Sequence, residues 1–251
     1  MLSWAQQRKF FFISGILLFF LAVFAVYGYV SFHSAPDCGN NAKDGNERGV
    51  DCGGSCTRVC RADVVPPIIH FARALEVDEG VWGAVAYVEN KNAGAGARNA
   101  PYVFKLYDEE NLLLYERHGT TYIPPRKIFA VFEGKMLSGV RTPTRATFEF
   151  TAEPLFFRIQ EPELSVSTKD FLTDENGSSL RAVITNTSRV PVEGIDATAL
   201  LFGADGNVSG ASATTVKVLP GGASATLTFT WPRSFEEPSR IEVLSTVPGR
   251  N

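Results

Sequence analysis

The hydrophobic and polar positions of this chain divide it into three stretches. Residues 10–32 contain no charged side chain and are apolar almost throughout. Residues 36–60 are rich in Asp, Asn, Glu and Gly and hold every cysteine of the chain. From residue 68 onward, short runs of alternating apolar and polar residues are separated by Gly, Pro and Asn turns, a pattern typical of β-strands. We therefore expect an apolar helix, a small cysteine-rich module and an all-β remainder.

The uncharged run predicts one membrane-spanning helix over residues 10–32. About 20 residues, at a rise of 1.5 Å each, cross the roughly 30 Å hydrocarbon core of a bilayer. The run is apolar on every face of a helix, which is not the pattern of a helix at the surface of a soluble core. Arg8 and Lys9 precede it, so the positive-inside bias places residues 1–9 in the cytoplasm and the rest of the chain outside.

A cleaved signal peptide is the alternative interpretation of this run. Such a signal has an apolar core of about 7–15 residues and a cleavage site made of small residues. Here the run is longer and ends in Tyr27, Tyr29 and Phe32. The sequence therefore favours an uncleaved anchor in the cell membrane, with the C-terminal domains extracytoplasmic.

The cysteines are predicted to form two disulfides, because exported thiols meet an oxidising environment. Four cysteines allow three pairings, and the thirteen, three and three intervening residues do not select one. Zinc binding is the alternative, but the spacing lacks the paired C-x2-C of common zinc sites. The residues concerned are Cys38, Cys52, Cys56 and Cys60.

Oxygen-bearing side chains crowd the same segment. Ca2+ takes about six to eight oxygen ligands from carboxylates, amides and carbonyls, and a flexible loop supplies them at short intervals. Calcium is therefore one candidate cofactor, and a solvated knot in which Asp and Asn serve only as turn residues is the other interpretation. The candidate ligands are Asp37, Asn40, Asp44, Asn46, Glu47 and Asp51.

This segment resembles a cysteine-rich metal-binding motif of extracellular bacterial and archaeal proteins, and it is similar to thrombospondin type 3 calcium loops. The matching residues are Glu47, Gly49, Val50, Asp51, Cys52, Gly53, Gly54 and Cys56. Asn40 and Asn41 stand in place of the motif's Asp and Gly, Asp44 in place of its Asn, and the last spacing is one residue longer. The resemblance implies that the module binds calcium.

The β-patterned region repeats itself at an offset of about 95 residues. Asn90 to Asn92 and Asn186 to Ser188 follow similar apolar runs, and similar turn and Pro signals come after both. The repeat predicts two tandem immunoglobulin-like β-sandwich domains, at residues 64–157 and 161–250, joined by a short, semi-rigid connector. The core candidates are Trp82, Phe104, Leu106 and Phe132 in the first repeat and Ala225, Leu227, Phe229 and Trp231 in the second.

The first repeat resembles the FxLYD domain family. The defining string is present as Phe104-Lys105-Leu106-Tyr107-Asp108, whereas the second repeat has Leu200-Leu201-Phe202-Gly203 in its place. The family is similar to immunoglobulin-like sandwiches and occurs on secreted or anchored prokaryotic proteins. The resemblance implies a surface protein without catalytic activity.

No pattern of catalytic residues is evident. His33, His70 and His118 lie in distinct segments, and none belongs to a metalloprotease motif such as H-E-x-x-H. The acidic run Asp108 to Glu110 is interpreted as the solvated tip of a hairpin. We therefore expect a protein that is not an enzyme.

Three sequons match the N-glycosylation acceptor pattern, which agrees with export. They begin at Asn176, Asn186 and Asn207. The formal charge of −3, with acids and bases interspersed, gives no basic footprint for nucleic acid. The sequence thus predicts a membrane-anchored binding or structural protein of the cell envelope with a protein or glycan partner. An accessory subunit of a larger membrane complex is the alternative.

Overall fold

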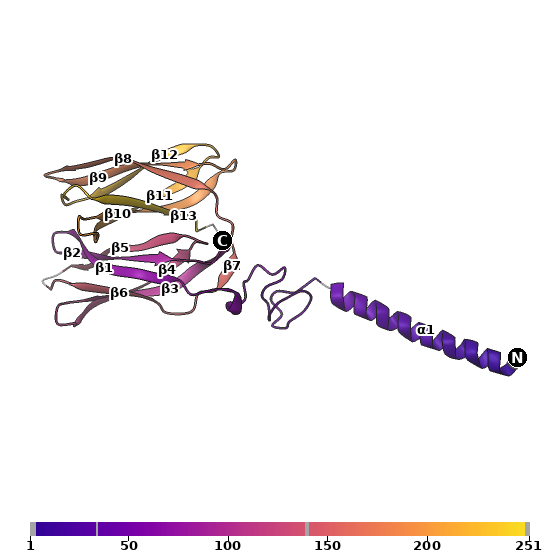
Figure 1. Cartoon of the computed structure of the whole chain (residues 1–251). Coiled ribbons are helices and arrows are strands. Elements are labelled where there is room, and N and C mark those ends of the chain that lie inside the picture. The colour runs from indigo at the N-terminus through magenta and orange to yellow at the C-terminus, as the bar shows by residue number, and fades with distance from the viewer. Residues whose placement is uncertain (1–3, 34, 139–140, 249–251) are drawn as a thin grey trace. The chain divides into compact units, whose positions relative to one another are not determined.

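The structure is a computed structural model that describes residues 4–33, 35–138 and 141–248 (Figure 1). The chain divides into two compact units, residues 1–60 and residues 61–251. The first unit holds the N-terminal helix and the cysteine-rich module, and the second holds all of the β-strands described below.

The helix α1 runs from Trp4 to His33. Its stretch Gln7–Val30 has a mean hydropathy of 2.6, and no part of that stretch is buried within the protein. The guanidinium of Arg8 lies 5.1 Å from the centre of the Trp4 ring, one turn away. By length and composition α1 can cross a membrane, and a signal sequence has the same features. The predicted apolar helix is confirmed, while its orientation remains a prediction.

The second unit begins with a 3-10 helix, η1 (Arg61–Asp63), and continues as antiparallel β-structure. The strands of its first half are β1 (Ile68–Asp78), β2 (Val81–Glu89), β3 (Ala95–Tyr107), β4 (Leu113–Ile123), β5 (Ile128–Ser138), β6 (Arg145–Phe150) and β7 (Phe156–Arg158). Those of its second half are β8 (Leu164–Asp174), β9 (Gly177–Asn186), β10 (Val192–Phe202), β11 (Val208–Leu219), β12 (Ser224–Trp231) and β13 (Arg240–Thr246). The all-β prediction is confirmed.

The second half repeats the strand order of the first. The first half has the sheets β1-β2-β5 and β4-β3-β6, with the short β7 paired to β3. The second half has the corresponding sheets β8-β9-β12 and β11-β10-β13. Each of these strands begins 95 to 97 residues after its counterpart, which agrees with the offset expected from the sequence. The domain boundaries themselves stay predictions, because the compact unit runs through both halves.

The four sheets lie in a stack (Figure 1). One apolar core lies between the two sheets of the second half and includes Leu180, Ile195 and Phe229. A second core joins the halves, because Leu75 and Val85 from the first half pack with Leu200 and Phe202 from the second. The two inner sheets are therefore covered on both faces, which explains the run of four buried residues that ends β10.

Three of the core predictions need correction. Phe104 and Leu106 are fully buried, and Leu227, Phe229 and Trp231 are buried as expected. Phe132, however, packs against the core that joins the two halves. Trp82 and Ala225 are only half-buried. Alternation along a strand identifies the apolar face, but it does not say which sheet will cover that face.

A buried asparagine occupies the same place in both halves. The Asn90 amide donates from Nδ2 to the carbonyl oxygens of Ala95 and Pro124, at 2.8 and 2.7 Å. Asn186 donates from Nδ2 to the carbonyl oxygens of Val190, Leu219 and Pro220, at 2.8, 3.0 and 3.2 Å. Each amide thus ties the end of the second strand of its half to the start of the third and the end of the fourth, and satisfies carbonyls that burial would otherwise leave unpaired.

Polar contacts supplement the apolar core between the halves. The Tyr87 hydroxyl donates to Glu242 Oε2 at 2.8 Å, and Arg233 Nη1 lies 2.8 Å from Glu76 Oε2. Burial, followed by this hydrogen bond to Glu242, raises the pKa of Tyr87 to about 12. These contacts hold the two inner sheets in a fixed relation.

The connector between the halves is held to the first half by a buried carboxylate. Glu161, whose side chain is 6% exposed, lies 2.5 Å from Lys127 Nζ through its Oε2 atom. Burial and the nearby Glu161 carboxylate raise the pKa of Tyr122. The connector is therefore packed, which agrees with the semi-rigid tandem expected from the sequence.

The turn after β3 differs from the solvated tip expected at Asp108 to Glu110. Asp108 is buried, its Oδ1 accepts the Leu112 backbone N–H at 2.8 Å, and its Oδ2 lies 2.9 Å from Arg141 Nη1. Glu109 and Glu110 are exposed as expected. The interpretation of Asp108 as solvated was wrong. The sequence pattern is the same whether a turn carboxylate caps backbone N–H groups or only meets water.

Candidate functional site in the cysteine-rich module

Two disulfides cross-link the cysteine-rich module. Cys38 pairs with Cys56 and Cys52 pairs with Cys60, with Cα–Cα distances of 5.6 and 5.0 Å. These distances lie in the usual range for disulfides. The predicted disulfides are confirmed, and the structure selects one of the three pairings that the sequence left open.

The module has almost no apolar core. Among residues 35–60, the buried hydrophobic residues are the half-cystines Cys56 and Cys60, while Val50 is 53% exposed. A segment of this size cannot bury enough apolar surface to fold by that means alone, so cross-links take over this role. The disulfides are therefore the main source of its stability.

Several positions of the matching motif require glycine, because neighbouring atoms lie where a Cβ atom would be. A Cβ atom on Gly54 would lie 2.0 Å from the Asn46 carbonyl oxygen, and one on Gly49 would lie 2.9 Å from Cys52 Sγ. Gly54 also has a φ of +57°, which glycine adopts without strain. The best-matching part of the motif therefore has a structural explanation that needs no metal.

Two buried carboxylates organise the backbone of the module. Glu47 is 5% exposed, and its Oε2 accepts the N–H groups of Asp44 and Asp51 at 3.3 and 3.2 Å. Asp51 is 6% exposed, and both of its carboxylate oxygens lie 3.1 Å from the Asn41 N–H group. Each carboxylate acts here as a hydrogen-bond acceptor for backbone groups that would otherwise lack a partner.

The more exposed candidate ligands are also hydrogen-bonded. Asp44 accepts the Asp37 backbone N–H through Oδ1 at 3.0 Å and the Asn40 amide through Oδ2 at 2.7 Å. Asn46 Oδ1 accepts the N–H and the hydroxyl of Ser55, at 3.2 and 2.8 Å. Asp37 thus takes part through its backbone. All six predicted residues lie in one small module, but the side-chain oxygens of Asn40, Asp44, Asn46, Glu47 and Asp51 accept hydrogen bonds from different donors.

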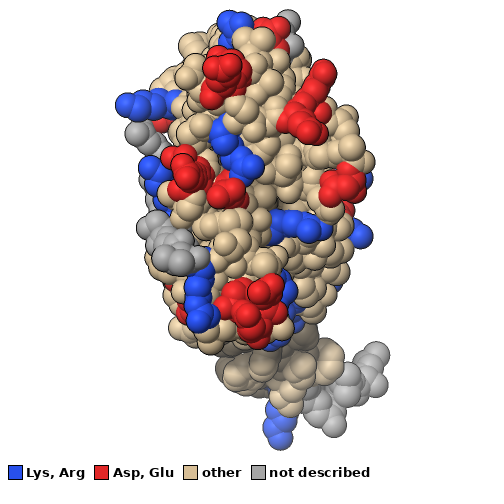
Figure 2. All heavy atoms as spheres, turned by 90° about the vertical axis from the view of Figure 1, so that its left-hand side faces the viewer, with Lys and Arg blue, Asp and Glu red and all other residues tan. Residues whose placement is uncertain are grey.

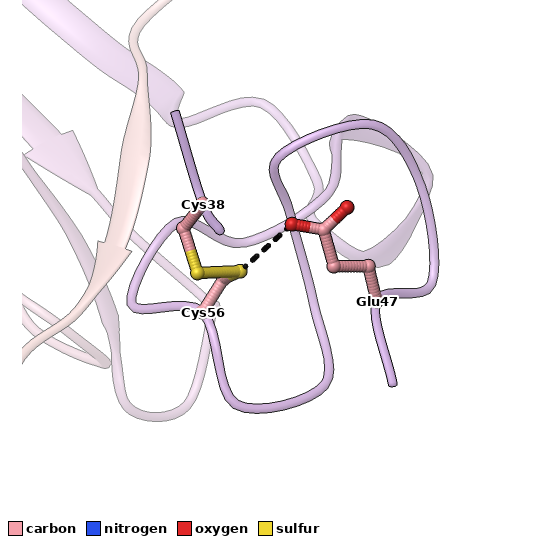
Figure 3. Close-up of side chains that lie close together, drawn as sticks. All are labelled: Cys38, Glu47 and Cys56. Atoms are coloured by element: carbon pink, nitrogen blue, oxygen red, sulfur yellow. Dashed lines mark hydrogen bonds between the residues drawn. A yellow bond between two sulfur atoms is a disulfide. The ribbon is translucent and has the colours of Figure 1, made fainter. Parts of the chain in front are cut away.

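Figure 3 shows the one grouping of potential metal ligands found among the described residues: Cys38, Glu47 and Cys56. Glu47 Oε1 lies 3.2 Å from Cys56 Sγ. Both sulfurs belong to one disulfide, so neither is a thiolate and neither can bind a metal. In the oxidised module this grouping is therefore a packing contact of a buried carboxylate on sulfur.

The arrangement does not fit a Ca2+ site as it stands. Among the described residues, no three of the carboxylates of Asp37, Asp44, Glu47 and Asp51 gather around a common point, whereas Ca2+ needs about six to eight converging oxygens. A cation would have to draw these oxygens away from the donors they now serve. Calcium binding stays a prediction.

The three sequons differ in their structural setting. Asn176 is exposed, and Asn207 is exposed while its amide donates to Asp205 Oδ2 at 2.7 Å. Asn186 is fully buried, and its Nδ2 is the donor to three carbonyls described above. A glycan on Asn186 is incompatible with this fold, because the side-chain nitrogen of Asn186 is buried and its N–H groups already donate hydrogen bonds. The other two acceptors stay predictions.

Among the described side chains, His70 and His118 each lie beside a glutamate. His70 Nε2 lies 3.0 Å from Glu89 Oε2, and His118 Nε2 lies 2.6 Å from Glu116 Oε1, on different sheets. Both pairs are partly exposed surface contacts. The side chain of His33 is outside the described part of the structure.

Sequence reasoning placed Asn41 in the motif but did not identify it as the partner of Asp51. Asn41 has a φ of +58°, and it directs its N–H at Asp51. The signal was present, because the motif has Gly at this position, and Asn is a common replacement for Gly in the left-handed region.

The charged side chains of the second unit are mixed in sign. On the face drawn in Figure 2, Lys and Arg alternate with Asp and Glu, and no large patch of one sign is seen. This distribution offers no continuous path for a phosphate backbone on that face.

No family model matches this chain, and no curated protein matches it. Among solved structures, the chain is similar to red sea bream transglutaminase, with 13% sequence identity and a TM-score of 0.22. The match covers 72% of this chain and 29% of that enzyme. The chain therefore spans less than a third of its neighbour, and the resemblance to FxLYD domains stays a prediction.

Proposed function

We propose that this chain is a single-pass membrane protein whose cysteine-rich module and β-sheet unit lie on the extracytoplasmic side. There it serves as a binding or structural protein of the cell envelope. The observation that supports this proposal best is a long, fully exposed apolar helix followed by four cysteines that are all paired in disulfides. Disulfides persist in oxidising compartments and are rare in the cytosol.

The flanks of α1 support the orientation. Arg8 and Lys9 lie at its N-terminal end, and the first acid in the chain is Asp37, beyond its C-terminal end. Basic residues within a turn or two of a span stay in the cytoplasm. The same argument favours an anchor that is retained, because Tyr27 and Tyr29 suit the headgroup region and do not suit a cleavage site.

A binding or structural role agrees with how the second unit is built. Its described polar groups are used mainly in hydrogen bonds and ion pairs that fix turns and sheets, such as the Asn90, Asn186 and Asp108 contacts. The two halves pack through a shared core, so they present one extended surface at a fixed geometry. Such a unit is suited to holding a partner at a set distance from a membrane.

Surface labelling of intact cells tests the topology. A membrane-impermeant amine reagent should modify Lys43, Lys91 and Lys217, which are exposed, and should leave Lys9 unmodified until the membrane is opened. Mass spectrometry of the purified full chain reads each lysine separately. Labelling of Lys9 together with protection of the others would reverse the orientation, and a chain that lacks its first 30 or so residues would show that the helix is a cleaved signal.

A charge-reversal variant provides the matched control. Replacing both flanking cations, Arg8→Glu with Lys9→Glu, should lower the labelled fraction of Lys43, because the positive-inside bias is removed. Lys217→Glu changes a cation on β11 that lies far from the span in sequence, and it should leave the labelling of Lys43 unchanged. Equal labelling of Lys43 in both variants would show that Arg8 and Lys9 do not determine the orientation of the helix.

Calcium, the cofactor that the resemblance implies, has a separate test. If the module binds Ca2+, millimolar Ca2+ should shift the amide resonances of Asn41, Asp44 and Asp51, whose N–H groups now bond to the carboxylates that would have to move. Asp44→Asn should weaken that response, and Asp63→Asn in η1 is the control. Unchanged resonances in the oxidised full chain would contradict calcium binding.

A further inference from the structure

The space between the two halves is not packed evenly. At one end Leu75 and Val85 pack against Leu200 and Phe202. Toward the other end, β3, β4 and β5 of the first half and β10, β11 and β13 of the second half line a partly open cavity of about 370 Å³. Ligand pockets in proteins typically measure about 300–1,000 Å³, so this volume suits one small molecule.

The floor of the cavity is a polar row on the inner sheet of the second half. Asp196 lies directly opposite Thr215 on β11 and opposite Thr246 on β13. Residues opposite one another in a sheet share a face, and side chains alternate along a strand, so this row faces the same way as Leu200. Thr198, one step nearer to Leu200, also lines the cavity. The Thr215 hydroxyl donates to Asp196 Oδ1 at 2.9 Å, and both groups keep further hydrogen-bonding capacity.

The opposite wall belongs to the first half, and the part of it that β5 forms is apolar and aromatic. Ala130 and Phe132 of β5 line it, together with Tyr102 of β3. The Tyr102 hydroxyl already donates to Glu133 Oε1 at 2.6 Å, so the ring is fixed in position. The cavity thus has a polar wall from the second half and a wall from the first half that combines these rings with Thr120 and Thr121 of β4.

The rim carries an amide and a cation at an irregular point of β3. The pairing of β3 with β4 shifts register between Ala97 and Ala100, and within this bulge Asn99 adopts a φ of +52°. Bulges re-aim side chains, and left-handed non-glycine residues are found often at functional sites. Arg98 lies beside it on the rim, and the structure gives its guanidinium no ion pair with a described residue.

We propose that this cavity binds one neutral saccharide unit of a glycan. Threonine hydroxyls both donate and accept, as sugar hydroxyls do, while Asp196, Asn99 and Arg98 supply planar polar groups that can meet two neighbouring hydroxyls at once. The aromatic wall suits the apolar C–H face of a sugar ring. Arg98 and Asp196 are the charged residues of the lining, one of each sign, so the cavity favours an uncharged ligand over an anion or a cation.

This inference deepens the proposed binding role and rests on it, since the cavity would meet a glycan outside the cell. The binding test is independent of the topology test, however, because it uses purified protein. Labelling of Lys9 in intact cells would contradict the location alone, and a failure to bind saccharides would contradict the ligand alone.

Saturation-transfer NMR on the full chain in nanodiscs tests the proposal, with free glucose, galactose, mannose and N-acetylglucosamine as probes at millimolar concentration. We expect transfer to the ring protons of at least one of these sugars. Thr215→Val, which keeps the side-chain shape and removes the hydroxyl, should weaken binding about fivefold to tenfold, the usual effect of one lost hydrogen bond. Arg98→Gln should weaken it by a similar factor.

The matched control is Thr226→Val on β12. Thr226 is an exposed strand threonine like Thr215, but it is not among the residues that line the cavity. Binding should be unchanged in this variant, and all three variants should keep the melting temperature of the parent chain. The proposal is overturned if none of the sugars shows transfer. It is also overturned if Thr215→Val and Thr226→Val bind a sugar with equal affinity.

Discussion

The two halves of the β-sheet unit have the same strand order but differ at their turns. Asn90 and Asn186 occupy equivalent places, and both are buried with their amides on backbone carbonyls. The turn after the third strand is different, because Asp108 is buried in the first half whereas Asp205 is exposed in the second. The shared asparagines satisfy buried backbone carbonyls in both halves, whereas the turn carboxylate is buried in the first half and meets water in the second.

The largest effect is expected at the shared asparagines. Asn186→Ala removes the donor of three carbonyl hydrogen bonds, one of them buried, and Asn90→Ala removes the donor of two buried ones. Each should lower the free energy of unfolding by about 2–4 kcal/mol. Urea unfolding of the full chain measures both. Asn176→Ala, at an exposed turn, is the control, and a loss at Asn176 equal to that at Asn186 would show that the buried amides have no special role.

A smaller effect is expected from the two turn carboxylates, which should behave differently. Asp108→Ala removes the acceptor of the Leu112 N–H and the partner of Arg141, and should cost about 1–2 kcal/mol in the same experiment. Asp205→Ala should change stability much less, because that side chain meets water. Equal losses in the free energy of unfolding for the two substitutions would show that the difference in burial between the turns does not affect stability.

The Asp205 turn should also respond to pH, because its carboxylate accepts hydrogen bonds from Asn207. Hydrogen bonds from the Asn207 side chain and backbone lower the pKa of Asp205 below its ordinary value. Any stability that follows is present above the unfolded-state pKa and is lost as the pH falls through the lower folded-state pKa. An NMR titration of the Asp205 carboxyl resonance should give a pKa below that of a typical exposed aspartate, and an ordinary pKa would contradict the role of Asn207.

Glycine at position 222 should matter through its backbone conformation alone. Gly222 has a φ of +71°, and no atom lies within 4 Å of where its Cβ would be. The equivalent residue of the first half, Arg126, has a φ of +48° and so shows that the turn accepts a side chain at a cost. Gly222→Ala should destabilise the protein by about 1 kcal/mol. Gly39→Ala, which also has open space but no positive φ, should have a smaller effect in the same urea experiment.

The smallest effect is expected at the contact between the halves, at high pH. Because the pKa of Tyr87 is raised to about 12 in the folded protein, the stability that its neutral hydroxyl contributes is present below the unfolded-state pKa of about 10. That stability is lost as the pH rises from there through about 12. Tyr87→Phe should show a flatter decline in melting temperature over this range than the parent. If the melting temperature of Tyr87→Phe fell with pH as steeply as that of the parent, the loss of stability would come from groups other than Tyr87.

Much of the architecture could be predicted because its signals are local. The uncharged run predicts the helix α1 (Trp4–His33), and alternation in stretches such as Ala225 to Trp231 predicts strands with one buried face. The stacking of the halves was not predicted. Leu200, Leu201 and Phe202 form a continuous apolar run, in which Leu201 belongs to one core and its two neighbours to another. Such a run indicates burial on both faces but does not identify the covering sheet.

The site was less predictable than the fold, for reasons of geometry. The four cysteines were recognisable, yet their pairing depends on how residues 38–60 turn in space. The oxygens of Asp44, Glu47 and Asp51 were named as cation ligands from residue type, whereas in the structure they accept backbone N–H groups. Residue type indicates what an oxygen can bind, but the local backbone conformation determines which donor lies within hydrogen-bond distance of it.

The core shared by the two halves has a consequence for how the protein is made. Synthesis proceeds from the N-terminus, so the first half is finished before the residues that cover Leu75 and Val85 have emerged. During that interval an apolar surface faces solvent, and a chaperone of the receiving compartment is the natural transient partner. We expect a chain that ends at residue 160 to aggregate or to remain chaperone-bound, whereas the complete chain is monodisperse, and size-exclusion chromatography of both would show it.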